Sequence, residues 1–124
     1  MPIYAIDHVQ VAMPAGGEEQ ARAFYGGLLG FAEVAKPVSL TGRGGVWFSA
    51  GTAHLHVGVE RAFQPAHKAH PAFLTDDLDA IVTRLQTAGC PVSFDEPPLD
   101  GYRRIHVVDP FGNRVELMEK SPSI

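Results

Sequence analysis

Apolar and polar residues alternate along most of this chain, and a helical spacing interrupts that alternation twice. Period-two alternation predicts strands over residues 3–13, 31–36, 46–50, 53–60, 69–75, 91–94, 102–108 and 113–119. Apolar residues three and four positions apart predict one helix from Glu18 to the stop at Gly30 and a second, capped by Asp76 and Asp77, through Ala88. The order strand, helix, strand, strand, strand therefore occurs twice.

The repeat also brings chemically similar residues to matching places. His8 corresponds to His70 at an offset of 62, and His56 corresponds to Glu116 at an offset of 60. Two halves of this size bury too little surface to be stable alone. We therefore predict an α+β fold in which two βαβββ modules, about 1–61 and 68–124, form one domain over residues 1–124. The modules are expected to pack into a cupped sheet around a shared cleft.

The closing hairpin places a carboxylate in a strand that otherwise looks like core. Asp109, Pro110, Gly112 and Asn113 form the predicted turn between its two strands. By period two, Glu116 lies on the face opposite the apolar residues Val115 and Leu117. Such a carboxylate lies either at the solvent surface or in a cavity with a partner.

Composition narrows the classes of function. Net charge is −4, which argues against nucleic acid as the main partner because phosphate binding favours a basic surface. No apolar run is long enough to cross a bilayer, so no membrane partner is expected. We see no signal peptide, and the single Cys90 cannot form an internal disulfide. These features favour a cytoplasmic protein.

Several polar residues of the predicted strands are expected to face inward. They are His8, Gln10, His54, His56, His70, Arg104, His106 and Glu116. Imidazoles and a carboxylate from separate strands are typical of a divalent metal site with two histidines and one carboxylate. The alternative explanation for each residue alone is a structural histidine or a solvated glutamate. His67, beside Lys68 in a loop, is expected to be solvated.

The sequence resembles the vicinal oxygen chelate superfamily, also called the glyoxalase / bleomycin-resistance / dioxygenase family. The motifs that carry the resemblance span nearly the whole chain: residues 6–11, residues 23–25 with 28–31, residues 68–73, and Asp109–Leu117 with its Asp-Pro-x-Gly-Asn-x-x-Glu-Leu pattern. The resemblance implies paired βαβββ modules with a metal between them. Its ligand positions fall on His8, His70 and Glu116, with His56 at a fourth position used by some members. His106 stands where many members carry a tyrosine that contacts substrate.

Two functions remain open at this point. The favoured one is a small enzyme whose divalent ion (Zn, Mn, Ni or Fe) chelates vicinal oxygens of a small substrate, as a lyase, isomerase, transferase or dioxygenase. Gln10, His54, His56, Arg104 and His106 are the expected substrate contacts, and Arg104 suggests an anionic substrate. The alternative is a protein that sequesters a drug or other small molecule without catalysis, with Trp47 or Phe48 as stacking surface. A homodimer is expected in either case.

Overall fold

The chain folds as two compact units, Met1–Gln64 and Pro65–Ile124. The computed structural model describes residues 2–94 and 99–121. Each unit contains an open four-stranded mixed sheet and a covering helix, in the order strand, helix, strand, strand, strand; the first unit also has a 3₁₀ helix, η2 (Val38–Arg43), between its second and third strands. The fold is therefore α+β with two βαβββ units, as the sequence predicts.

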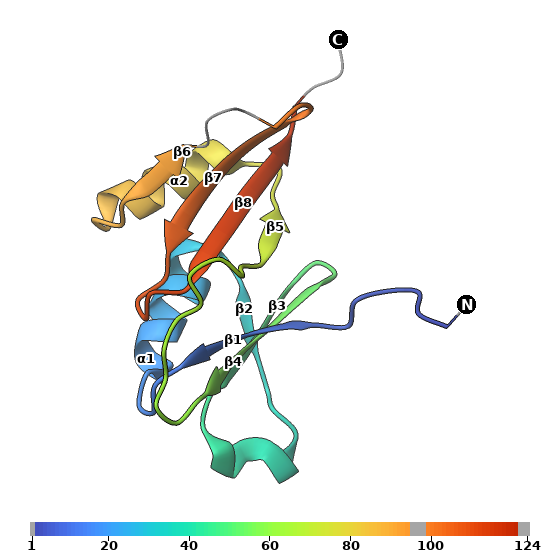
Figure 1. Ribbon diagram of the computed structural model, residues 1–124, viewed down its shortest axis with the longest axis vertical. Helices are drawn as coiled ribbons and strands as arrows, with labels where there is room; N and C mark the ends of the chain where they lie inside the picture. Colours follow the sequence, from blue (N-terminus) through green and yellow to red (C-terminus); the bar gives the residue numbers. More distant parts are fainter. Residues whose placement is uncertain (1, 95–98, 122–124) are drawn as a thin grey trace. The chain divides into compact units, whose positions relative to one another are not determined.

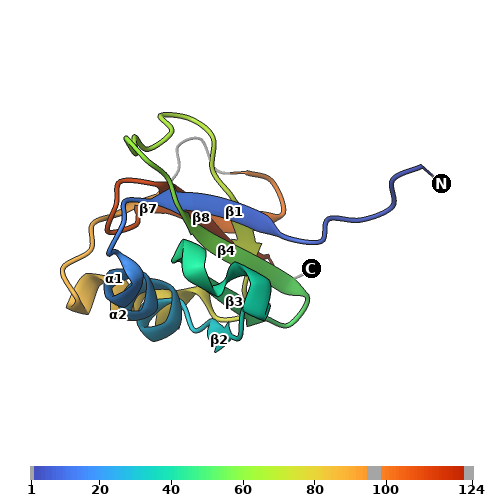
Figure 2. The same cartoon turned by 90° about the horizontal axis from the view of Figure 1, so that it is seen from below.

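In the first unit, the first and last strands run side by side. The sheet has the order β1-β4-β3-β2; β1 is parallel to β4, and the other pairs are antiparallel (Figure 2). Its strands are β1 (Val9–Met13), β2 (Ala32–Val34), β3 (Val46–Ala50) and β4 (Ala53–Val59).

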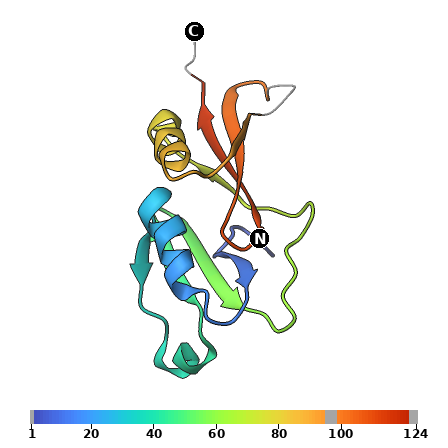
Figure 3. The same ribbon diagram turned by 90° about the vertical axis from the view of Figure 1, so that its left-hand side faces the viewer.

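A helix covers one face of this sheet (Figure 3). It begins as α1 (Glu18–Ala21) and continues as a π-helical segment, η1 (Arg22–Leu28). Phe24 and Tyr25 are buried from this segment, which contacts β2 and β3. The apolar spacing predicts the helix and its buried face, but it does not predict the wider π turn. Gly30, with φ of +88°, ends the helix as expected.

The second unit repeats this arrangement with β5 (Ala72–Leu74), β6 (Val92–Phe94), β7 (Tyr102–Val108) and β8 (Arg114–Lys120). Its sheet has the order β5-β8-β7-β6, with β5 parallel to β8 (Figure 1). Helix α2 (Leu78–Thr87) buries Leu78, Ile81 and Leu85 and contacts β6 and β8. The Asp77 side chain accepts a hydrogen bond from the Ala80 backbone N–H and caps this helix.

Strand register supports the internal repeat residue by residue. Gln10 lies opposite His56 in the first sheet, and Ala72 lies opposite Glu116 in the second. Ala72 follows Gln10 by 62 residues, and Glu116 follows His56 by 60, which are the two offsets of the repeat in the sequence. On the other side of the same strands, Trp47 is the partner of His56, and His106 is the partner of Glu116.

The first strand of each unit is shorter than alternation predicts. His8 precedes β1 and His70 precedes β5, so neither lies within a strand. In the first unit the parallel ladder starts at the pair Val9 and Leu55, although β4 itself begins at Ala53. Residues 2–8 continue from β1 as an extended arm (Figure 1).

None of the helices in residues 2–94 and 99–121 has the length and apolar character that crossing a membrane requires.

Candidate metal centre

Glu116 is a buried carboxylate, although it lies in the middle of β8. Only 5% of its surface is exposed, and it points to the face opposite Val115 and Leu117. Of the two interpretations of this residue, the structure therefore excludes the solvent surface and supports a buried position with partners. Burying an ionised carboxylate is costly unless other groups compensate its charge.

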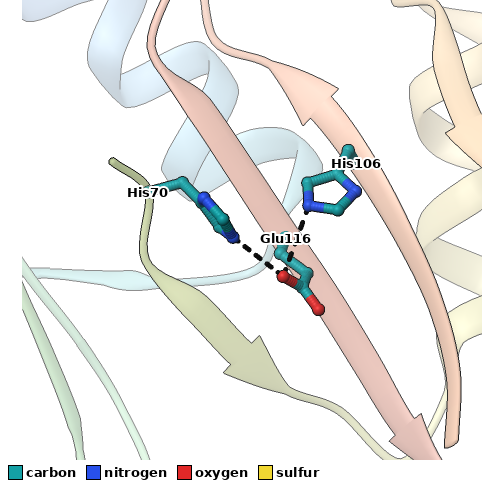
Figure 4. A group of neighbouring side chains, drawn as sticks. All are labelled: His70, His106 and Glu116. Carbon is teal, nitrogen blue, oxygen red and sulfur yellow. Dashed lines mark hydrogen bonds and ion pairs between the residues drawn. The ribbon is translucent and has the colours of Figure 1, made fainter. Parts of the chain in front are cut away.

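Three side chains of the second unit surround this carboxylate. The His70 Nε2 atom lies 2.9 Å from Glu116 Oε1, and the His106 Nε2 atom lies 3.3 Å from the same oxygen (Figure 4). Arg104 Nη1 lies 3.3 Å from the other oxygen, Oε2. One carboxylate oxygen thus faces two imidazoles, and the second faces a guanidinium.

The hydrogen bonds of His70 indicate what its Nε2 atom can do. Nδ1 lies 2.8 Å from the Lys68 carbonyl oxygen, which can only accept, so this hydrogen bond requires a proton on Nδ1. In the neutral ring, Nε2 then has a lone pair that faces the carboxylate oxygen. Two lone pairs at this distance need a cation between them, either a second proton on the ring or a metal ion.

This arrangement fits a divalent metal ion. His70, His106 and Glu116 each offer one donor atom, and the three atoms lie within 4.8 Å of one another. Two imidazoles and one carboxylate are a common donor set for zinc and other first-row metals. A metal-binding histidine usually donates its other N–H to a carbonyl or carboxylate, as His70 does to Lys68.

His106 joins this group because of the hairpin register. It lies on β7 directly opposite Glu116 on β8. The sequence predicts His106 as a substrate contact and not as a metal ligand. The turn contains the signal that places it: Asp109 N–H donates to Asn113 O, and counting three residues outward from each of these gives His106 and Glu116.

The equivalent positions of the first unit form a stack of rings instead. The Trp47 and His56 rings are parallel, with centroids 3.7 Å apart, and the His8 ring stacks on His56 at 4.1 Å. Burial lowers the pKa of His56, and the nearby His8 lowers it further. His56 is therefore neutral near pH 7. Phe48, the other aromatic residue considered as stacking surface, is part of the core.

His8 shares one feature with His70. Its Nδ1 atom lies 2.9 Å from the Asp7 carboxylate, which leaves Nε2 available to a ligand or a metal. The hydrogen bond from His8 lowers the pKa of Asp7. The two histidines predicted as ligands, one in each unit, thus both have Nδ1 bound to an oxygen. Neither oxygen partner was identified from the sequence, although Asp7 is the neighbouring residue.

The other predicted contacts lie in different surroundings. Gln10 is exposed on β1, and its side-chain amide covers Gly58, where an added Cβ would lie 2.8 Å from Nε2. His54 is exposed on β4. Arg104 contacts Glu116. Arg114 lies on the same face of β8 as Glu116 and contacts backbone carbonyls of the loop before β5.

The chain belongs to the Glyoxalase/Bleomycin resistance protein/Dioxygenase superfamily, whose family model matches residues 5–117. A crystal structure described as a glyoxalase family protein from Bacillus anthracis is 48% identical, with a TM-score of 0.91 and 96% of this chain and 97% of that chain covered.

Two further solved structures are each 25% identical to this chain. One is TnmS3, an antibiotic binding protein from Streptomyces sp. CB03234, with a TM-score of 0.72 and coverage of 98% and 99%. The other is lactoylglutathione lyase from Agrobacterium tumefaciens, with a TM-score of 0.71 and coverage of 96% of both chains. No curated protein matches the sequence. The family of the chain is therefore established, but the similar structures have different activities and do not identify one for this chain.

Proposed function

We propose that this protein is a divalent-metal-dependent enzyme of the superfamily. The observation that supports it best is the approach of His70 Nε2 to Glu116 Oε1 at 2.9 Å while His70 Nδ1 is bound to a carbonyl. His70 and Glu116 are the proposed ligands in the second unit. His8 is the proposed ligand from the first unit, and His56 is a further candidate because it is neutral near pH 7.

The bound ion would act as a Lewis acid toward two adjacent oxygens of the substrate. The residues around it bind and orient that substrate. His106, with Nε2 near Glu116, is placed either to complete the ligand set or to donate a hydrogen bond to substrate. Gln10 and His54 are the proposed outer contacts. Arg104 holds the second oxygen of Glu116 and so fixes the direction of the first.

The proposed substrate is a small anion with vicinal oxygens. A metal dication and Arg104 together leave the surroundings of Glu116 positive, although the whole chain has a net charge of −4. The reaction is that of a lyase, isomerase, transferase or dioxygenase, and the 25% identity to a lactoylglutathione lyase supports a search among the first two. Zn, Mn, Ni and Fe all suit the donor set.

Metal content tests this proposal. Purified protein loaded with each metal and dialysed should retain about one ion per chain. His70→Ala, Glu116→Ala and His8→Ala should each abolish tight binding, whereas His67→Ala, a matched loop histidine, should retain it. If the first three variants bind metal as well as the parent does, the site is misassigned.

A thermal-shift screen of the loaded protein with hydroxy acids, oxo acids, phosphonates and neutral analogues then tests the substrate class.

A second function is favoured by the stack in the first unit. Trp47, His56 and His8 form a stack of three rings with His56 in the middle, and a 25% identical relative is an antibiotic binding protein. Sequestration of a planar drug without catalysis would use an outer ring of this stack. Metal-free protein that binds such a compound, with loss of binding in Trp47→Ala, would favour sequestration over the enzyme.

The proposal also includes assembly and location. We propose a homodimer in the cytoplasm; the single cysteine, which cannot form an intrachain disulfide, agrees with a reducing compartment.

A further inference from the structure

The loop before β5 carries His70 without the support of a helix or strand. Residues 63–71 have no regular secondary structure, and residues 66–70 are exposed. Two contacts attach this loop to the start of β8. Pro65 lies against Gly112 so closely that an added Cβ on the glycine would be 3.0 Å from Pro65 Cγ. The second contact is made by Arg114.

Arg114 binds the loop through backbone carbonyls. Its Nη1 atom lies 3.4 Å from the His67 oxygen and 3.4 Å from the Lys68 oxygen. The Lys68 oxygen is also the acceptor for His70 Nδ1, at 2.8 Å. A carbonyl oxygen has two lone pairs, so it can accept from both groups at once. Arg114 and His70 therefore share one acceptor.

We infer that Arg114 is a positioning residue for His70. By holding the Lys68 carbonyl toward the ring, it keeps Nδ1 protonated and bound to that carbonyl and directs Nε2 at Glu116. The guanidinium is suited to this because one planar group spans two successive carbonyls and remains charged at every working pH. Without it, the loop carbonyls turn to water, and the ring gains a second tautomer and other orientations.

This inference rests on the proposed function where it treats His70 as a metal ligand, but the tautomer of His70 can be measured without metal. Arg114→Met keeps the length and apolar stem of the side chain and removes its donors. Arg103→Met is the matched control, because Arg103, on the neighbouring strand, pairs with Asp79 and Glu119 on the helix side of the sheet. Long-range proton–nitrogen NMR of the imidazoles reports the tautomer of each histidine in metal-free protein.

The parent and Arg103→Met should show His70 protonated on Nδ1, and Arg114→Met should show a mixture or the other tautomer. In chelator competition, Arg114→Met should bind zinc about ten-fold more weakly than the parent, in the range that loss of an outer partner causes. Arg114→Lys, which keeps the charge and one short donor, should recover part of both effects. It also serves as the test variant if Arg114→Met does not fold.

An unchanged His70 tautomer in Arg114→Met, or equal changes in Arg103→Met, would overturn the inference. If the parent binds no metal while the tautomer still shifts in Arg114→Met alone, the positioning role holds and the proposed metal function fails. The two ideas are thus tested separately.

Discussion

The charge of Glu116 is costly to bury, because a carboxylate with 5% exposure has lost most of its water. Arg104 supplies the permanent positive charge beside it, at 3.3 Å from Oε2. His70 and His106 lie at the other oxygen and become cationic only when protonated. Arg104 is therefore the partner of Glu116 whose charge does not depend on pH.

We predict that Arg104→Met destabilises the metal-free protein by about 1–3 kcal/mol, the cost of leaving a buried acceptor without its charged donor. Urea unfolding of the metal-free protein at about pH 8 measures this loss.

The double variant Arg104→Met with Glu116→Gln is the control, because it removes the carboxylate charge together with its partner. Its free energy of unfolding should lie above that of Arg104→Met alone. Equal stability of Arg104→Met and the parent would mean that Arg104 does not compensate the charge of Glu116.

The residue types of the site could be predicted from the sequence, but their protonation and partners could not. Period two places Glu116 opposite the apolar face, and the burial of Val115 and Leu117 confirms it. The contact of Arg104 with Glu116 depends on rotamers that no spacing specifies. Asp7 and the Lys68 carbonyl bind Nδ1 of His8 and His70, and these contacts depend on how each imidazole ring is oriented. Ring orientation leaves no pattern in the sequence.

At the scale of elements, the two sheets have the same strand order and register but carry different residue types at equivalent positions. Equivalent positions hold Trp47 and His56 in the first unit and His106 and Glu116 in the second. Aromatic rings at these positions stack in parallel, whereas an imidazole and a carboxylate direct lone pairs toward each other. The repeat therefore predicts where the site residues lie, and the residue type at each position decides what they do.

Alternation predicted every strand of the described residues, and its errors lie at strand ends. The observed β3 coincides with the predicted segment, because the turn residues on both sides bound it. The predicted strand from residue 3 begins at Val9, because hydrogen bonding to β4, and not side-chain alternation, decides where the ladder starts. The π-helical turns of Arg22–Leu28 likewise arise from backbone hydrogen bonds that the apolar spacing does not distinguish.

One tertiary contact of the first helix makes its stability depend on pH. Glu18 Oε2 accepts a hydrogen bond from the Gly45 N–H at 3.0 Å, which joins the helix start to the end of the loop that contains η2 (Val38–Arg43). This bond lowers the pKa of Glu18 below its ordinary value of 4.5. A carboxyl group with a depressed folded-state pKa stabilises the protein above the unfolded-state pKa and loses that contribution as pH falls through the folded-state value.

We therefore predict that Glu18→Gln is less stable than the parent at neutral pH, by at most about 1 kcal/mol because Glu18 is partly exposed. The difference should shrink as pH falls below 4.5, where the parent also loses its carboxylate. Urea midpoints across this pH range measure it. Glu19→Gln is the control, since Glu19 is exposed and pairs with Arg22 three residues further along the chain. A difference that grows toward acid pH would contradict the assignment.

At the scale of the whole molecule, the open sheets leave strand edges exposed. β5 and β6 form the two edges of the second sheet, and they expose Leu74 by 65% and Phe94 by 61%. Exposed edges with apolar side chains pair readily with another chain unless they are covered. A twofold dimer pairs one edge of each copy with the same edge of its partner, so this interface is closed and does not extend to further copies.

We predict that light scattering at micromolar concentration gives twice the chain mass of 13.4 kDa. Leu74→Lys and Phe94→Lys each place a charge on one edge, and a lysine on a strand edge opposes pairing. If β5 or β6 forms the interface, the matching variant should become monomeric, while the other should remain dimeric and serve as its control. Gln86→Lys, on an exposed position of α2, controls for the added charge itself. A parent that runs at the mass of one chain would remove the dimer from the proposed function, and two lysine variants that both remain dimeric would exclude these edges as its interface.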